Sequence, residues 1–181
     1  MKSFLDLSRY FLLLLCGGII ILTACGSDDE DDTSAASGDG TVTWTHNGTT
    51  YTSTIGSSAI ADGADKIIIT GGSKDNNNNV SLALEGINTK GAAVYDLRKG
   101  SMVNSLPVGG ITLNGSSAQA TQYLSLYGPA ASNGNITVTQ YDKAGQKISG
   151  TFTFTAGALP NTSATGTQSV TNGSFSFTKF R

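Results

Sequence analysis

Apolar and polar residues alternate with a period of two through most of the chain after residue 40. Because successive side chains of a β-strand point to opposite faces, this alternation predicts strands with one buried and one solvated face. The stretches with this pattern are residues 41–46, 49–54, 80–84, 121–127, 135–142, 148–155 and 174–178. Residues 66–70 instead carry three consecutive isoleucines, which predicts a strand that is buried on both faces.

Turn signals separate these strands. Asn47-Gly48 and Asn172-Gly173 are the residue pairs that favour two-residue hairpin turns, because both central positions need a positive φ. The first turn would place Trp44 opposite Tyr51 on one face. At residues 143–145 we expect a three-residue turn, whose odd length would let residues 136 and 138 share the core face with residues 152 and 154.

The pattern as a whole predicts an all-β fold, either an antiparallel β-sandwich or a flattened barrel of about nine or ten short strands. Residues 57–65 are small and polar and are expected to form a loop or one helical turn, and residues 71–79 a loop tip. After residue 24 no stretch shows a convincing helical period. Residues 41–181 are therefore interpreted as one all-β domain.

The first 24 residues have a different pattern. Lys2 and Arg9 precede an apolar run at residues 11–22, about 12 residues long, whereas a membrane-spanning helix needs about 20. The length and the charged start predict a secretory signal peptide over residues 1–24. A transmembrane anchor and a buried helix are the alternatives.

The end of this run is more specific than an ordinary signal. Leu22-Thr23-Ala24-Cys25 resembles the bacterial lipobox. The resemblance implies that diacylglycerol is attached to the thiol of Cys25, that a peptidase cleaves between Ala24 and Cys25, and that the new amino group is acylated. A single acyl chain binds a membrane only marginally, and stable anchoring takes two signals. The three acyl chains expected on Cys25, such as palmitate, would therefore hold the protein at a membrane.

Residues 25–40 are predicted to be the lipidated cysteine followed by a disordered, acidic tether. Ser-Asp-Asp-Glu at residues 27–30, just after the predicted lipidated cysteine, resembles the surface-export signal of Bacteroidota lipoproteins. This resemblance implies a lipid-anchored protein of the outer membrane at the cell surface. A merely soluble spacer is the alternative.

Cysteine use and charge narrow the chemistry. Cys16 lies in the predicted signal peptide and Cys25 would carry lipid, so no thiol is left for a disulfide or a cysteine-based metal site. The isoelectric point of about 5.2 gives no basic footprint, so nucleic acid is not an expected partner.

The C-terminal third carries a second resemblance. Tyr141-Asp142 is followed by Ile-Ser-Gly-Thr-Phe-Thr-Phe-Thr-Ala at residues 148–156 and by Asn-Gly-Ser-Phe at residues 172–175. With these motifs the chain resembles a family of Bacteroidota surface lipoprotein domains of unknown function, loosely over residues 44–177. The resemblance implies an all-β fold and an envelope location. It supplies no activity, because the motif is a pattern of hairpins and core positions.

Candidate catalytic residues are few. His46, the single histidine, is interpreted as a strand-edge residue, because no motif places a second member of a triad beside it. A glycoside hydrolase needs two carboxylates across one cleft. The candidates are Asp62, Asp65, Asp75, Glu85, Asp96 and Asp142. Most of them fall in predicted loops, where aspartate commonly caps the backbone. Residues 62–65 and 75–79 also lack the ligand spacing of a calcium loop. We therefore expect no catalytic, cofactor-binding or metal-binding residues.

Aromatic residues would form a sugar-stacking platform if they were exposed. The candidates are Trp44, Tyr51, Tyr95, Tyr123, Tyr127 and Tyr141. The alternation places Trp44 and Tyr51 in the core and Tyr141 toward solvent.

Three functions remain open. The preferred one is a cell-envelope lipoprotein that acts as a surface-exposed binding or accessory module for a glycan or a surface protein, without enzyme activity. The alternatives are an extracellular hydrolase that uses a carboxylate pair, and a structural subunit of an envelope assembly that binds no ligand.

Overall fold

The computed structural model describes residues 40–53, 55–63 and 65–181. The predicted signal peptide, the cleavage site between Ala24 and Cys25 and the predicted tether up to residue 39 lie outside the described residues. Within them, the chain forms an 11-stranded antiparallel sheet that folds into two layers. This confirms the all-β, antiparallel fold predicted from the alternation.

The first layer has the strand order β2-β1-β11-β10-β9-β6. Its strands are β1 (Gly40–His46), β2 (Thr49–Thr52), β6 (Val94–Arg98), β9 (Ser132–Asp142), β10 (Lys147–Ala158) and β11 (Thr167–Phe177). The second layer has the order β8-β7-β5-β4-β3. Its strands are β3 (Ile55–Ala61), β4 (Lys66–Gly72), β5 (Asn78–Glu85), β7 (Val108–Leu113) and β8 (Thr121–Leu124).

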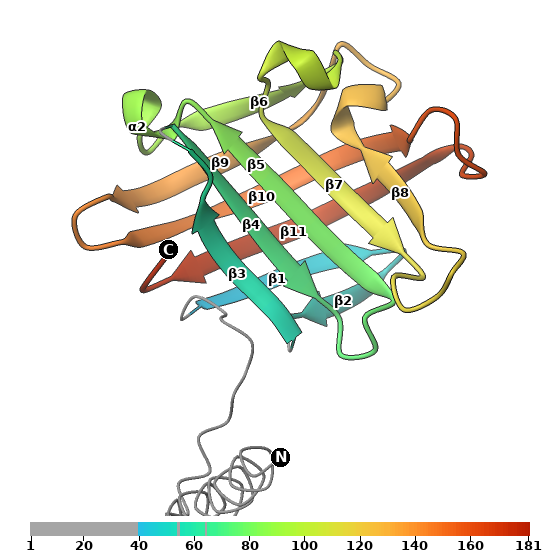
Figure 1. Ribbon diagram of the computed structural model, residues 1–181, viewed down its shortest axis with the longest axis horizontal. Coiled ribbons are helices and arrows are strands. Elements are labelled where there is room, and N and C mark those ends of the chain that lie inside the picture. Colours follow the sequence, from blue (N-terminus) through green and yellow to red (C-terminus); the bar gives the residue numbers. More distant parts are fainter. Residues whose placement is uncertain (1–39, 54, 64) are drawn as a thin grey trace, which may run out of the picture. The chain divides into compact units, whose positions relative to one another are not determined.

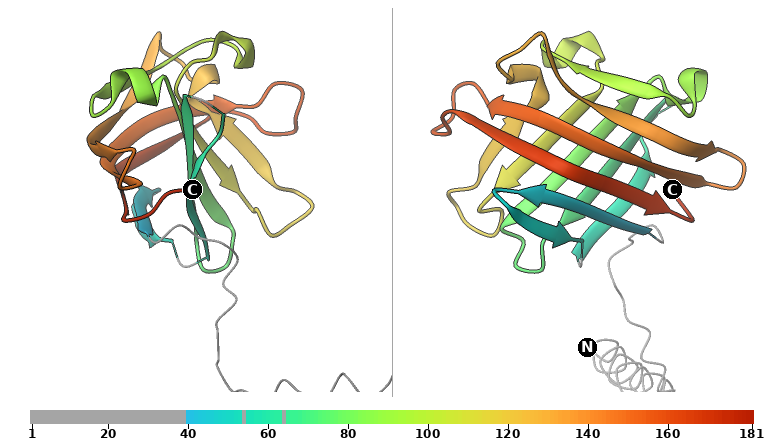
Figure 2. Two further views of the ribbon diagram at one scale, coloured as in Figure 1. Left: turned by 60° about the vertical axis from the view of Figure 1, so that its left-hand side comes forward. Right: turned by 180° about the vertical axis from the view of Figure 1, so that it is seen from behind.

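Strands of the two layers pair with each other at one place. The last two residues of β10, Gly157 and Ala158, pair with Leu124 and Tyr123 of β8, while the rest of β10 pairs with β9 and β11. The two layers cross face to face, as Figures 1 and 2 show. The sheet does not close on itself, because β2 and β3 are the two ends of its strand order. The fold is thus a sandwich joined along one side rather than a barrel.

The inward faces of both layers form the core. Trp44 and Tyr95 are completely buried there, and a cluster of phenylalanines packs beside them, with the rings of Phe152 and Phe154 6.2 Å apart. The first hairpin follows the prediction. Asn47 and Gly48 have φ of 49° and 76°, and the rings of Trp44 and Tyr51 stack 5.5 Å apart.

The second predicted hairpin is wrong. Asn172-Gly173 is not a turn but a β-bulge inside the continuous strand β11. Asn172 takes a φ of 49°, and the pairing with both β1 and β10 shifts by one residue there. The same tolerance of positive φ that favours a turn also favours a bulge. Phe175 and Phe177 face the core as predicted.

The turn between β9 and β10 also differs from the prediction. Asp142 pairs with Lys147, so four residues rather than three connect the strands, and Gln146 has a φ of 55°. A bulge between Val138 and Gln140 adds one residue to β9 and so brings the inward-facing positions of the two strands back into register. Ile136 and Phe152 therefore still lie opposite each other in the core.

Four further segments differ from the prediction. The predicted loop at residues 57–65 is mostly strand β3, because pairing with β4 imposes an extended backbone on small residues. The predicted strand at residues 121–127 ends at Leu124 and continues as the single turn η2 (Ser125–Tyr127). Short helical turns also occur at α2 (Ile87–Lys90) and η1 (Met102–Asn104). In the described part of the chain, no helix has the length and apolarity that crossing a membrane requires.

Candidate functional site

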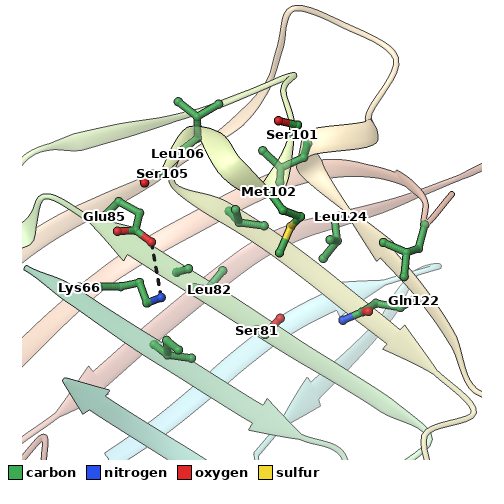
Figure 3. A pocket seen from close by; sticks show the side chains of 15 residues that line it. Lys66, Ser81, Leu82, Glu85, Ser101, Met102, Ser105, Leu106, Gln122 and Leu124 are labelled. Carbon is green, nitrogen blue, oxygen red and sulfur yellow. Dashed lines mark ion pairs between the residues drawn. The ribbon is translucent and has the colours of Figure 1, made fainter. Parts of the chain in front are cut away.

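A groove lies on the outer face of the second layer, on the side away from the core. Its apolar part encloses about 450 Å³ and is lined by β4, β5, β7, β8 and the segment that connects β6 to β7. Figure 3 shows this arrangement, with Met102 above the strands. A volume of this size is typical of small-molecule sites.

The floor of the groove is a row of apolar side chains across neighbouring strands. Ile60 pairs with Ile68, Ile68 with Ala83 and Ala83 with Val108, so all four share the outer face. Ile68, Ala83 and Val108 line the groove, while Ile60 at the edge is 46% exposed. The apolar run at residues 66–70 thus has its explanation: Ile67 and Ile69 face the core, and Ile68 faces the groove.

The roof is the segment that contains η1. Its base is held by the amides of Lys99 and Gly100, which donate to the carbonyls of Ala131 (2.9 Å) and Leu126 (3.1 Å). The turn itself is closed because the amide and the hydroxyl of Ser101 both donate to Asn104 Oδ1, each at 2.8 Å. The fixed turn presents Met102, which is 65% exposed and lines the groove.

One end of the groove is charged. Lys66 Nζ lies 2.6 Å from Asp62 Oδ2 and 3.6 Å from Glu85 Oε1 (Figure 3 draws the second pair). The hydrogen bond to Asp62 and the attraction of both carboxylates raise the pKa of Lys66. The ammonium is therefore charged at neutral pH and is already shared between two carboxylates.

The other end opens into a second lobe of about 490 Å³, which shares Ser81 and Gln122 with the apolar part. Its polar side chains are uncharged: Thr70, Asn76, Asn79, Ser81, Thr112 and Gln122. Asn79 Oδ1 is buried there and has no hydrogen-bond partner among the described residues. Ser81 and Leu124 pack closely over Gly110, because a Cβ at that position would lie 2.8 Å from Ser81 Oγ and 2.9 Å from Leu124 Cδ2.

The structure does not bring the predicted carboxylates together as a catalytic pair. The carboxylates of Asp65, Asp75 and Asp142 accept hydrogen bonds from the backbone amides of Asn88, Asn77 and Gly145. The Ser73 hydroxyl and the Asn77 amide hold the pKa of Asp75 below its usual range. Asp96 is paired with Arg98 Nε at 2.8 Å, and the Ser132 hydroxyl and Arg98 lower its pKa.

Asp62 and Glu85 are the two carboxylates that approach one group, but that group is Lys66. Of these two, only Glu85 lines the apolar lobe, and none of the pockets described here has two carboxylates in its wall. Nor do His, Cys, Asp and Glu side chains gather into a metal-binding group anywhere in residues 40–53, 55–63 and 65–181.

His46 is not the edge residue that the sequence indicated. It is 5% exposed, and both ring nitrogens are engaged: Nε2 lies 2.8 Å from Gln168 Oε1, and Nδ1 lies 2.9 Å from Asn78 Nδ2. This bonding makes His46 part of the core rather than of a reactive site.

The aromatic side chains give no sugar-stacking platform. Trp44, Tyr95 and Tyr123 are buried, Tyr127 is half-buried, and Tyr51 packs on Trp44. Tyr141 was expected to face solvent, but it is half-buried, stacks on Phe180 at 6.0 Å and donates a 2.6 Å hydrogen bond to Asn88 Oδ1. The residues that line the two lobes of the groove are all non-aromatic.

Sequence reasoning missed the groove. The signals that point to it are apolar residues at outward positions of strands, such as Ile68, and the adjacent apolar pair Met102-Val103 in a polar loop. Alternation alone does not tell an outward apolar residue from an inward one unless the pairing of the strands is known.

Comparison with known proteins gives a family and no function. A family model described as "Domain of unknown function (DUF6252)" matches residues 39–178. No curated protein and no solved structure matches the chain.

Proposed function

The chain belongs to the DUF6252 family, and we propose that it is a lipid-anchored protein of the cell envelope whose domain binds a ligand in the groove above the second layer. The anchor is Cys25, and the location is the outer membrane of a Bacteroidota-type cell, with the domain at the surface. The support for this location is the lipobox-like sequence at residues 22–25 and the acidic run at residues 28–32.

The groove is the observation that carries the binding role. Its walls are mainly aliphatic, its volume is about 450 Å³, and it is roofed by a turn that exposes Met102 and Val103 at 65% and 88%. Exposed apolar surface of this kind marks a binding site more often than it serves stability. The roofing turn also lies at the opposite end of the domain from β1, the strand that follows the proposed tether (Figures 1 and 2).

The binding role is tested with 1-octanol, a small aliphatic probe. We expect it to shift the NMR signal of the Met102 methyl group. Ala83→Phe places a ring on the groove floor and should abolish this shift. Thr151→Phe is the matched control, because Thr151 is exposed on the outer face of the first layer. Equal shifts in both variants, or none in the native domain, would rule out the groove as a binding site.

The anchor is tested by Cys25→Ser. Without a thiol no lipid is attached, so we expect the protein to stay uncleaved or to leave the membrane fraction. Mass spectrometry of the mature N-terminus and fractionation of the cells measure this. Surface exposure is measured separately, by protease treatment of intact cells. If the protein is fully protected there, the domain lies on the periplasmic face.

The two alternative functions make different predictions. A hydrolase with a carboxylate pair lacks support in the geometry, because Asp62 and Glu85 are held by Lys66 rather than facing each other across a cleft. A structural subunit without a ligand would give no groove-dependent response to the aliphatic probe.

A further inference from the structure

We infer that the groove takes an uncharged amphiphile, with one aliphatic chain in the apolar lobe and a head bearing hydroxyl or amide groups in the polar lobe. This inference rests on the proposed binding function and specifies its ligand.

The apolar lobe fits an aliphatic chain rather than a ring. Ile68, Ala83, Val108 and Leu124 give it a smooth aliphatic surface without an aromatic face on which a sugar or a base would stack. Met102 covers this surface with a flexible, polarisable side chain. Methionine adapts to chains of varied shape, as at other surfaces that bind several ligands.

The polar lobe selects the head. Its side chains offer hydroxyls and amides but no formal charge, so an ionic head placed there would lose its hydration without finding a counter-ion. Uncharged hydroxyls and amides, in contrast, can exchange hydrogen bonds with Thr112, Gln122 and Asn79. Asn79 Oδ1 in this lobe is buried and has no hydrogen-bond partner among the described residues, which leaves one acceptor unused.

The charged end of the groove disfavours an anionic ligand bound in the reverse orientation, with its head beside Lys66. Lys66 is the one cation lining the apolar lobe, and Asp62 and Glu85 already surround it. A carboxylate or phosphate placed there would gain one attraction and meet two like charges. A free fatty acid therefore fits neither end.

The passage between the lobes allows one molecule to occupy both. Ser81 and Gln122 line both lobes, so the two lobes meet at these side chains.

The experiment measures affinity by calorimetry for hexyl, octyl and decyl β-glucoside, each below the concentration at which it forms micelles. Each methylene that enters the lobe contributes about 0.8 kcal/mol, so affinity should rise about fourfold per methylene until the groove is filled. Octanoate should bind at least about tenfold more weakly than octyl glucoside, and glucose alone should give no signal.

The head site is tested with Thr112→Val combined with Gln122→Leu. Losing two hydrogen-bonding side chains should lower the affinity for octyl glucoside about tenfold and leave the affinity for 1-octanol unchanged. Thr171→Val with Gln140→Leu is the matched control, because both residues are exposed on the first layer. Circular dichroism checks that each variant is folded.

The outcomes separate this inference from the proposed function. If 1-octanol binds in the groove but octanoate binds as tightly as octyl glucoside, the uncharged head is wrong and the binding function stands. If Thr112→Val with Gln122→Leu lowers the affinity for 1-octanol as much as that for octyl glucoside, the two-lobe arrangement is wrong. If no aliphatic probe shifts the Met102 methyl group, the proposed function fails as well.

Discussion

Asn78 is the residue through which the two layers exchange side-chain hydrogen bonds in the core. It begins β5 in the second layer, and its Oδ1 accepts from Trp44 Nε1 of β1 at 2.8 Å. Its Nδ2 donates to His46 Nδ1, which leaves Nε2 of the imidazole to donate to Gln168 Oε1. Four polar groups from three strands thus satisfy one another where water does not reach.

Replacing Asn78 by alanine should therefore be costly. The change leaves the Trp44 indole N–H and the His46 ring nitrogen buried without partners, so we expect a loss of about 2–4 kcal/mol in the free energy of unfolding. Urea denaturation measures it. Gln140→Ala, at an exposed amide on β9, should change stability by less than about 0.5 kcal/mol. A similar small loss for Asn78→Ala would show that the network does not contribute to stability.

At the scale of strands, the bulge at Asn172 sets which side chains of β11 face the core. The pairing shifts by one residue at this point, so Val170 before the bulge and Phe175 after it are both buried despite their odd separation of five positions. A regular strand would point one of them outward. The bulge thus lets both ends of one long strand contribute to the core.

The variant pair Asn172→Gly and Asn172→Val tests this backbone geometry. Asn172 is exposed and has a φ of 49°, a conformation that glycine adopts freely and a β-branched residue resists. Asn172→Gly should be neutral within about 0.5 kcal/mol, and Asn172→Val should cost about 1–3 kcal/mol in thermal or urea unfolding. Equal stabilities would mean that the positive φ is not required.

The predictable elements are those fixed by neighbours in sequence. The hairpin at Asn47-Gly48, the Trp44–Tyr51 pair and the inward phase of Phe175 and Phe177 follow from local turn chemistry and alternation. Strand β3 and the two bulges do not, because pairing with distant strands determines them. The groove is even harder to predict from local sequence patterns, since its walls come from four strands and a connecting segment.

At the scale of the whole molecule, the C-terminal tail links the second layer to the first. The amide of Arg181 donates to the Ala59 carbonyl at 3.0 Å, and the amide of Ala61 donates to the Arg181 carbonyl, so the tail extends the sheet beyond β3. The amide of Phe180 donates at 2.7 Å to the Gln146 carbonyl in the turn between β9 and β10. The buried Phe180 ring stacks on Tyr141. This short segment therefore helps to fasten the open side of the sandwich, where Ser57 Oγ of β3 also donates to the Gly40 carbonyl of β1 at 3.0 Å.

Phe180→Ala should loosen this fastening. Loss of a buried phenylalanine costs about 3–5 kcal/mol in a closed core, and we expect the lower part of this range because the site lies at the edge. Hydrogen exchange at the Ala61 amide should speed up more than exchange at the β10 and β11 amides. Lys179→Ala is the control, since Lys179 is exposed and should leave both quantities unchanged. Uniformly faster exchange would instead show that the domain opens as one unit.

Met102 gives the groove a sensitivity to oxidants. The sequence has two methionines, Met1 and Met102, and Met102 is 65% exposed at the roof of the groove. Peroxide would convert its thioether to a sulfoxide, a polar group that covers an aliphatic surface poorly. The affinity for alkyl chains would then fall while the core, which holds no thioether among the described residues, stayed intact. If the groove binds an aliphatic chain as proposed, reduction of the sulfoxide by a methionine sulfoxide reductase would restore its affinity, so oxidation would switch binding reversibly.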